Sequence, residues 1–283
     1  MQVNKLIHDR TIESARLTSN MDLLQVLRQL AQKRSEIKML NIYKGLPISY
    51  ETSIDSIGDS EIQMRSNKHQ IACLYYQGES YLQVEELPFI IRSQVMSLNL
   101  AKENAIFSNF EAVKNNIGSR GQIRVEPNEP LIVAIQFNGS ASEILAPLAD
   151  ISAGGASVYF ETYMFPARLS QPGTGLTMTI SLPDSASQKL KKLSQKPSIE
   201  NRKLSMPLRT NPHEGQDGNI VITARGMVIA VHPEFHLKRY RVSAKLFFKD
   251  LSRTVILQYI SQRQSEIIQD LRVLSDELYS LKK

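Results

Sequence analysis

The sequence contains a single cysteine, no long apolar run and no recognisable catalytic motif. Cys73 alone cannot form an intrachain disulfide, and a zinc site built from several cysteines is excluded. No stretch reaches the roughly 18 uncharged apolar residues that a membrane-spanning helix requires. The first ten residues also lack the apolar segment of a signal peptide. We therefore expect a soluble, cytoplasmic protein.

Enzyme signatures are equally scarce. There is no G-x-x-x-x-G-K-[S/T] phosphate loop, no nucleophile elbow and no His-rich metal set. His232 and His236 are four residues apart, but Pro233 favours a turn, so the two imidazoles need not share a helix face. We therefore predict a protein that is not an enzyme, with no catalytic residue, no metal and no cofactor.

Length and charge suit two domains of ordinary size. The chain has 283 residues, of which 42% are hydrophobic, so each domain can bury a core. The net charge of +6 raises the possibility of nucleic-acid binding, but the basic residues are spread along the whole chain. Such spreading is typical of a solvated surface, which would still attract a small dianion.

The N-terminal half predicts one helix followed by short strands. Leu23, Leu27 and Leu30 recur at helical spacing within 21–34, and Ser19 and Asp22 form a start that resembles a capping box. Turn residues then separate six candidate strands, namely 37–43, 48–54, 61–66, 70–76, 81–87 and 90–98. This spacing predicts a small barrel or sandwich, with Cys73 as a buried thiol in the fourth strand.

The C-terminal half predicts a second β domain. Candidate strands are 131–137, 146–150, 176–182, 220–231 and 239–248, and a long helix begins at Ser252. The polar insertion 185–218 is interpreted either as a functional loop or as a partly disordered segment, and its role is not predicted.

Two short motifs flank the first of these strands. The first is Arg120-Gly-Gln-Ile-Arg124, and the second is Asp150-Ile-Ser152-Ala-Gly-Gly155. An R-x-x-x-R pair followed about two dozen residues later by [D/N]-x-S-x-x-G resembles the signature of PilZ domains. These are small six-stranded β-barrels that bind the bacterial second messenger cyclic di-GMP. The resemblance implies cyclic di-GMP as the ligand, bound by Arg120, Arg124, Asp150, Ser152 and Gly155.

The residue types fit this ligand chemically. An arginine fork can donate two hydrogen bonds to guanine, stack on its face or pair with phosphate. Asp150 can accept from the N1 and N2 donors of guanine, and Ser152 adds a hydroxyl. Gly154 and Gly155 let the backbone approach the base closely. Ser119 could influence how many nucleotides bind. The alternative is that the arginines are solvated linker charges and that 150–155 is only a turn.

Three basic residues later in the chain, Lys238, Arg239 and Arg241, permit two interpretations. They could form a phosphate-reading edge near the site, or they could belong to an exposed strand face. We favour the exposed face.

A helix and a β-barrel ahead of a PilZ domain resemble the YcgR, or flagellar-brake, architecture. We therefore predict a mainly β fold with two small β-barrels in tandem and a long C-terminal helix. The predicted domains are an N-terminal barrel over 1–114, a PilZ domain over 115–251 and the helix over 252–283. The polar linker 114–120 ends at the first motif arginine.

The C-terminal helix carries a heptad-like seam. Its members alternate three and four residues apart: Leu257, Ile260, Gln264, Ile267, Leu271, Leu274, Leu278 and Leu281. One interpretation is an amphipathic helix packed on its own chain. We favour partial docking followed by a coiled-coil partner helix, and hence a homo-oligomer in which Gln264 could fix the register.

The predicted function is that of a cyclic di-GMP receptor. The resemblance implies that nucleotide binding at the linker reorients the domains and controls an unknown protein partner, plausibly flagellar motor or pilus machinery in motility regulation. Two alternatives remain open. One is a non-catalytic scaffold that assembles through its C-terminal helix, and the other, which we disfavour, is a basic barrel that binds nucleic acid.

Overall fold

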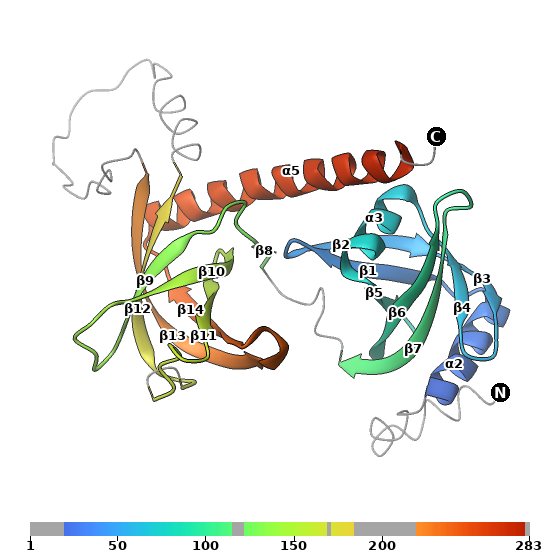
Figure 1. The fold of residues 1–283 in the computed structure, drawn as a ribbon, viewed down its shortest axis with the longest axis horizontal. Coiled ribbons are helices and arrows are strands. Elements are labelled where there is room, and N and C mark those ends of the chain that lie inside the picture. The colour runs from blue at the N-terminus through green and yellow to red at the C-terminus, as the bar shows by residue number, and fades with distance from the viewer. Residues whose placement is uncertain (1–19, 115–121, 169–170, 184–218, 281–283) are drawn as a thin grey trace, which may run out of the picture. The chain divides into compact units, whose positions relative to one another are not determined.

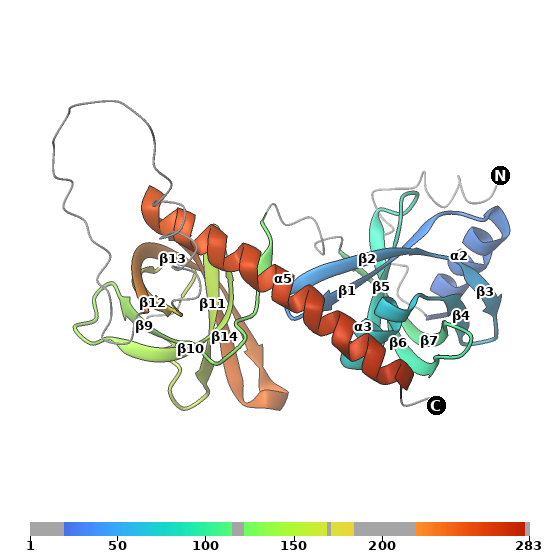
Figure 2. The ribbon, with the colours of Figure 1, turned by 90° about the horizontal axis from the view of Figure 1, so that it is seen from above.

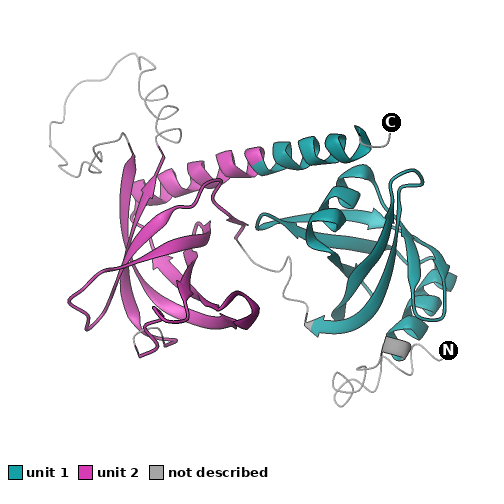
Figure 3. Cartoon of the chain, viewed as in Figure 1, with its two compact units in different colours: residues 1–121, 267–283 teal, residues 122–266 magenta. Residues whose placement is uncertain are grey.

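The computed structural model describes residues 20–114, 122–168, 171–183 and 219–280. The chain divides into two compact units, coloured separately in Figure 3. Unit 1 contains 1–121 and 267–283, and unit 2 contains 122–266. The predicted insertion 185–218 and the linker residues 115–120 lie outside the described residues.

Unit 1 is built on one curled antiparallel sheet (Figures 1 and 2). Its strands follow the order β2-β1-β5-β6-β7-β4-β3. Their bounds are β1 (Ile37–Tyr43), β2 (Leu46–Thr52), β3 (Ile54–Ile57), β4 (Ile62–Arg65), β5 (Glu79–Val84), β6 (Phe89–Asn99) and β7 (Asn104–Lys114). Helix α2 (Asn20–Lys33) supplies Leu23, Leu24, Leu27 and Leu30 to the core. The predicted N-terminal helix is therefore confirmed.

The predicted strand 70–76 is wrong, because this segment forms helix α3 (Lys68–Gln77). The side chain of Asn67 caps its start by accepting from the backbone N–H of Gln70 at 2.9 Å. Gly78, with φ of 70°, ends it in the left-handed region. These two caps fix the helix, although its apolar residues form a continuous run that also suits a strand. Cys73 is fully buried within α3, as expected.

Strand β7 was not predicted, because the apolar period breaks inside it. Phe107 and Phe110 are both buried although they are three residues apart. Asn109 lies between them with φ of 52°, and the pairing with β6 shifts register twice in this region. A bulge of this kind adds a residue to the strand and interrupts the two-residue alternation of its side chains. The strand therefore cannot be recognised from alternation in the sequence.

Unit 2 is a closed antiparallel barrel. Its strands are β9 (Ile132–Phe137), β10 (Ile144–Ser152), β11 (Gly155–Glu161), β12 (Gly175–Leu182), β13 (Ile220–Glu234) and β14 (Arg239–Phe247). They follow the order β11-β14-β13-β12-β9-β10, and the β10–β11 pairing closes the ring. The two-residue strand β8 (Arg124–Val125) adds to β10. Apolar side chains that alternate along each strand fill the interior, as Val133, Ile135 and Phe137 do on β9.

Helix α5 (Asp250–Ser280) belongs to both units, since the division between them falls within it. In unit 2, Arg263 is 2% exposed, and its Nε donates to the backbone oxygen of Glu126 at 2.9 Å. In unit 1, Lys44 pairs with Asp270 at 2.6 Å and Lys68 pairs with Asp276 at 3.3 Å. The predicted long C-terminal helix is confirmed.

The seam residues of this helix are not exposed as one continuous apolar stripe. Ile267, Leu271 and Leu278 are buried within the single chain, whereas Leu257 is 47% exposed. Three seam residues in the part that belongs to unit 1 are therefore already covered, whereas Ile268 and Val273, which lie outside the seam, are exposed. This burial favours an amphipathic helix packed on its own chain over a coiled-coil partner helix. Leu281 lies outside the described residues.

The fold class is as predicted: mainly β, with a closed barrel, a second curled sheet of barrel type and a long helix. Among the described residues, no helix is long and apolar enough to cross a membrane.

Cys73 offers a direct test of the core of unit 1. Burial raises the pKa of its thiol to about 12, so the reactive thiolate is scarce well into the alkaline range. We expect a thiol-specific disulfide reagent at about pH 8 to label the folded chain at least about 100-fold more slowly than the urea-unfolded chain. Equal labelling rates would contradict the described packing of α3.

The packing of α5 can be tested by comparing two single variants, each of which replaces a leucine of this helix by alanine. Leu271→Ala removes a buried side chain and should lower the free energy of unfolding by about 2–5 kcal/mol. Leu257→Ala, at an exposed position of the same helix, should change it by less than about 0.5 kcal/mol. Urea denaturation followed by circular dichroism measures both. Similar losses, or a lower mass in light scattering for Leu271→Ala only, would restore the coiled-coil interpretation.

Candidate functional site on the outer wall of the barrel

The two halves of the signature meet on the outer wall of the barrel. Arg124 begins β8 and pairs with Ser152 at the end of β10. Ser152 also pairs with Gly155 at the start of β11, so the chain reverses direction over 152–155. The second motif arginine therefore lies beside the turn that forms the other half of the signature.

Asp150 is the buried charge of this site. It is only 2% exposed. Its Oδ1 lies 3.4 Å from Nη1 of Arg124, and its Oδ2 accepts from Nη2 of Arg241 on β14. A buried charge is tolerated when it is paired and hydrogen-bonded. Asp150 thus links three strands, β8, β10 and β14, through two ion pairs.

Two serines orient the guanidinium of Arg124. Its Nη1 donates to Oγ of Ser157 on β11 at 3.3 Å, and that oxygen lies 3.0 Å from Oγ of Ser243 on β14. Both serines are buried. The register places Ser157 opposite Ser243, so the polar contacts form a band across neighbouring strands. Arg124 is therefore held by a carboxylate and a hydroxyl together.

The turn needs glycine for close approach. The hydroxyl of Ser152 donates to the backbone oxygen of Gly155 at 3.1 Å. A Cβ on Gly155 would collide with the carbonyl oxygen of Ala244 on β14, whereas a Cβ on Gly154 would meet only the side-chain amide of Gln122. Gln122 belongs to the first motif. The side chain of Gln122 therefore lies directly against the glycine turn.

A second cationic pair lies along β14. Arg239 stacks on the ring of Tyr159 with Cζ 3.6 Å from the ring centroid, and Arg241 lies 6.0 Å from the same ring. Arg239 also pairs with Glu234 at 2.6 Å. Burial raises the pKa of the Tyr159 phenol, and the two guanidiniums offset only part of this rise. The phenol therefore remains neutral at physiological pH.

Our interpretation of Lys238, Arg239 and Arg241 as an exposed strand face is wrong for the two arginines. Their side chains are 28% and 32% exposed, and each pairs with a carboxylate. The alternation of side chains along β14 places Arg241 on the same face as Ser243, and this pattern is visible in the sequence. The sequence could not show that β11 pairs with β14 and that β10 pairs with β11. Lys238 is exposed in the turn before β14.

Arginines and carboxylates are balanced at this wall. Arg124, Arg239 and Arg241 lie beside Asp150 and Glu234, and a third carboxylate, Glu126, is close enough to raise the pKa of Tyr159. The three guanidiniums can still pair with an anionic ligand, and their planar faces can stack on a base.

The described structure brings together most of the predicted site residues, namely Arg124, Asp150, Ser152, Gly154 and Gly155. Arg120 and Ser119 lie outside the described residues, so their roles stay predictions. Arg241, Tyr159 and Ser157 were not predicted to belong to the site.

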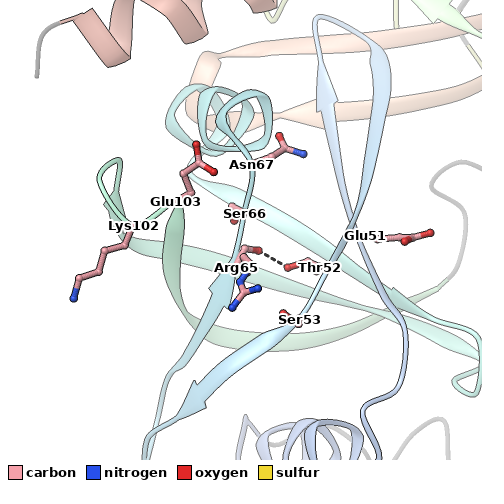
Figure 4. A pocket seen from close by; sticks show the side chains of 8 residues that line it. All are labelled: Glu51, Thr52, Ser53, Arg65, Ser66, Asn67, Lys102 and Glu103. Atoms are coloured by element: carbon pink, nitrogen blue, oxygen red, sulfur yellow. Dashed lines mark hydrogen bonds between the residues drawn. The ribbon is translucent and has the colours of Figure 1, made fainter.

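A cleft of about 440 Å³ lies in unit 1 and contains none of these motif residues (Figure 4). Its lining is polar, and it consists of Glu51, Thr52, Ser53, Arg65, Ser66, Asn67, Lys102 and Glu103. The lining contains two carboxylates and two cations, so its net charge favours neither an anion nor a cation.

The candidate histidine pair has no metal-site geometry around it. His232 is on β13, and His236 is in the short helix η1 (Phe235–Leu237), both exposed. Within the described ranges, no three or more His, Cys, Asp or Glu residues are grouped so that they could hold a metal ion.

The two glycines give a matched test of the turn. Gly155→Ala should lower stability by about 1–3 kcal/mol, because the new methyl group must displace the backbone of β14. Gly154→Ala should cost less than about 0.5 kcal/mol, because the side chain of Gln122 can rotate away. Thermal unfolding measures both changes. A larger loss for Gly154→Ala would contradict the described turn.

Comparison with known proteins gives likenesses of fold. No family model matches the sequence, and no curated protein matches it. Among solved structures, the K. pneumonia MrkH complex with c-di-GMP covers 89% of this chain and 97% of its own, at 12% identity and a TM-score of 0.40.

Two further structures span most of the chain. The Bacillus subtilis inhibitor of motility MotI (DgrA) covers 82% of this chain and 96% of its own, at 15% identity and a TM-score of 0.38. The Escherichia coli YcgR complex with c-di-GMP covers 91% and 96%, at 10% identity and a TM-score of 0.35. Such scores carry no functional argument, so the function is argued from the residues of the chain. In its signature residues, the chain resembles PilZ-domain cyclic di-GMP receptors.

Proposed function

We propose that this protein is a cyclic di-GMP receptor that binds the nucleotide on the outer wall of the barrel of unit 2. The observation that carries the proposal is the pairing of buried Asp150 with Arg124 and Arg241. It joins Arg124 of the first motif to Asp150 of the second. The ligand contacts are Arg120, Arg124, Asp150, Ser152 and Gly155, with Gly154 and Ser119 as further candidates and Arg241 as an addition.

The chemistry of the wall fits a guanine nucleotide. Arg124 can donate to O6 and N7 of guanine or pair with a phosphate, and Asp150 can accept from N1 and N2 of the base. Each such two-point contact contributes about 1–3 kcal/mol of discrimination. A micromolar complex requires about 8 kcal/mol in total. In this proposal, the Tyr159 ring and Arg241 supply further contacts, while buried Ser157 acts only by orienting Arg124.

Binding requires an exchange of partners. Both carboxylate oxygens of Asp150 are engaged by arginines in the described structure. The contact with Arg124 is a long one, at 3.4 Å. We propose that Arg124 turns from Asp150 toward the nucleotide while Arg241 stays paired. Asp150 then accepts from the guanine edge in place of Arg124.

The output of such a receptor is a conformational change. Residues 115–121 connect the two units and carry Arg120. We propose that capture of Arg120 by the ligand fixes the path of this segment and reorients the units. A ligand shifts such an equilibrium only by its differential affinity for the two states. The protein would then control a protein partner without catalysis, in flagellar or pilus-based motility.

The oligomer predicted through the C-terminal helix has less support than the receptor. Leu271 and Leu278 are covered by the chain itself, and a partner helix would have to displace that packing. We therefore propose a receptor that does not depend on self-association through α5.

Calorimetric titration of the full-length protein with cyclic di-GMP tests the proposal. We expect saturable binding, no comparable heat with GTP or cyclic di-AMP, and a loss of at least about 100-fold in affinity for Arg124→Ala, because the principal guanine and phosphate donor is removed. Arg253→Ala, an exposed arginine on α5, is the matched control and should bind like the parent.

Arg241→Ala separates the added residue from the predicted ones. It should weaken binding by about tenfold, and its circular dichroism spectrum should match that of Arg124→Ala. Unchanged affinity for Arg124→Ala would refute the site. No heat with the parent, together with salt-dependent binding of random DNA that survives loss of Arg120 and Arg124, would favour nucleic-acid binding instead.

A further inference from the structure

Four large apolar side chains project from one end of the unit 2 barrel. Tyr163 is 85% exposed, Phe235 78%, Met164 50% and Leu237 48%. We call this set the apolar tip. Single exposed apolar residues are ordinary on protein surfaces, but a group of aromatic and aliphatic side chains exposed to this extent marks an interaction site.

Hydrogen bonds hold the two halves of the apolar tip together. Both the backbone N–H and the hydroxyl of Thr162 donate to the backbone oxygen of Lys238, at 3.0 and 2.6 Å. This contact joins the turn after β11, which carries Tyr163 and Met164, to the β13–β14 turn, which carries Phe235 and Leu237. The strands leading into it are already paired, with Glu161 opposite Arg239.

The base of the tip is rigid. Phe165 stacks on Tyr240 with ring centroids 4.0 Å apart and planes 14° apart. The exposed side chains thus stand on an ordered aromatic pair. Figures 1 and 2 show the β13–β14 turn on the side of the barrel away from α5. The apolar tip is therefore not covered by the helix of its own unit.

The charges around the tip are mostly positive. Lys238 directly follows Leu237 and is exposed, Arg168 is exposed four residues after Met164, and Glu161 is an exposed carboxylate two residues before Tyr163. Arg239 and Glu234 neutralise each other as a pair at 2.6 Å. A partner that complements this tip presents an apolar interior beneath an anionic surface.

We propose that the apolar tip docks on an anionic lipid bilayer, with Phe235, Leu237 and Tyr163 inserted among the headgroups. The tip consists of two turns that project, which suits insertion into a deformable interface. Aromatic side chains with adjacent lysine and arginine are the residues that bind the bilayer interface. Anionic headgroups attract the basic rim over a Debye length. None of the proposed nucleotide contacts belongs to the tip, so docking does not depend on the proposed function.

The chain has no tryptophan, which permits a clean reporter. Phe235→Trp in the full-length protein should show a blue shift in emission when phosphatidylcholine vesicles containing phosphatidylglycerol are added, because the indole leaves water. Vesicles of phosphatidylcholine alone should give a much smaller shift. Leu145→Trp, placed on an exposed residue of β10, is the matched control and should show none.

Cosedimentation supplies the loss-of-function test. The double variant Phe235→Ser, Leu237→Ser should bind the anionic vesicles at least about tenfold more weakly than the parent, since two large apolar side chains are lost. Met96→Ser, an exposed residue of unit 1, should bind like the parent. Raising the salt concentration should weaken binding by the parent.

Three results would overturn the proposal. The first is an absence of cosedimentation by the parent with either vesicle. The second is equal binding by the parent and the double variant. The third is a fall in mass by light scattering for the double variant in the absence of lipid, which would assign the tip to contact with a second copy of the chain. The circular dichroism spectrum and thermal midpoint of the double variant should match those of the parent, which shows that the barrel remains folded.

Discussion

The barrel wall of unit 2 depends on the need to neutralise one buried carboxylate. Asp150 is almost wholly removed from water, and removing either arginine partner would leave the carboxylate with half of its compensation. Because Arg124 and Arg241 come from β8 and β14, the same ion pairs that neutralise Asp150 also hold distant parts of the sequence side by side. The chemistry of the site and the closure of this wall are thus one arrangement.

Strand β8 is too short to hold its own position. Two residues give only two paired positions with β10, so other contacts must fix Arg124. Val125 is fully buried, and buried Arg263 on α5 donates to the backbone oxygen of Glu126 immediately afterwards. A hydrogen bond from a charged donor is worth about 1.5–3 kcal/mol. Helix α5 therefore positions the motif arginine without touching the site itself.

The sequence predicted the helices and strands that are determined by local residue patterns. Helix α5 and most strands follow from periodicity and residue type, whereas the two motif halves were recognised by their resemblance to a known signature. Two kinds of feature were missed. The segment 70–76 was predicted as a strand from its apolar run, but caps at Asn67 and Gly78 stabilise it as helix α3. Strand β7 was not predicted because the bulge at Asn109 interrupts its alternation. Strand β11 was missed because Ser157, which faces outward, is buried by its neighbours. Arg241 was assigned wrongly because its partner lies on a strand 91 residues earlier in the chain.

The ion pairs at Asp150 also bear on selectivity. A simple anion could attract Arg124 away from the carboxylate, but it would leave a buried charge less well compensated, and this costs free energy. A ligand that brings both a phosphate for the arginine and a donor edge for Asp150 restores the compensation. Guanine offers two such donors, N1–H and N2–H, next to the acceptors that arginine reads. In the receptor that we propose, the wall would discriminate against inorganic phosphate and adenine nucleotides by the cost of leaving Asp150 without its second partner.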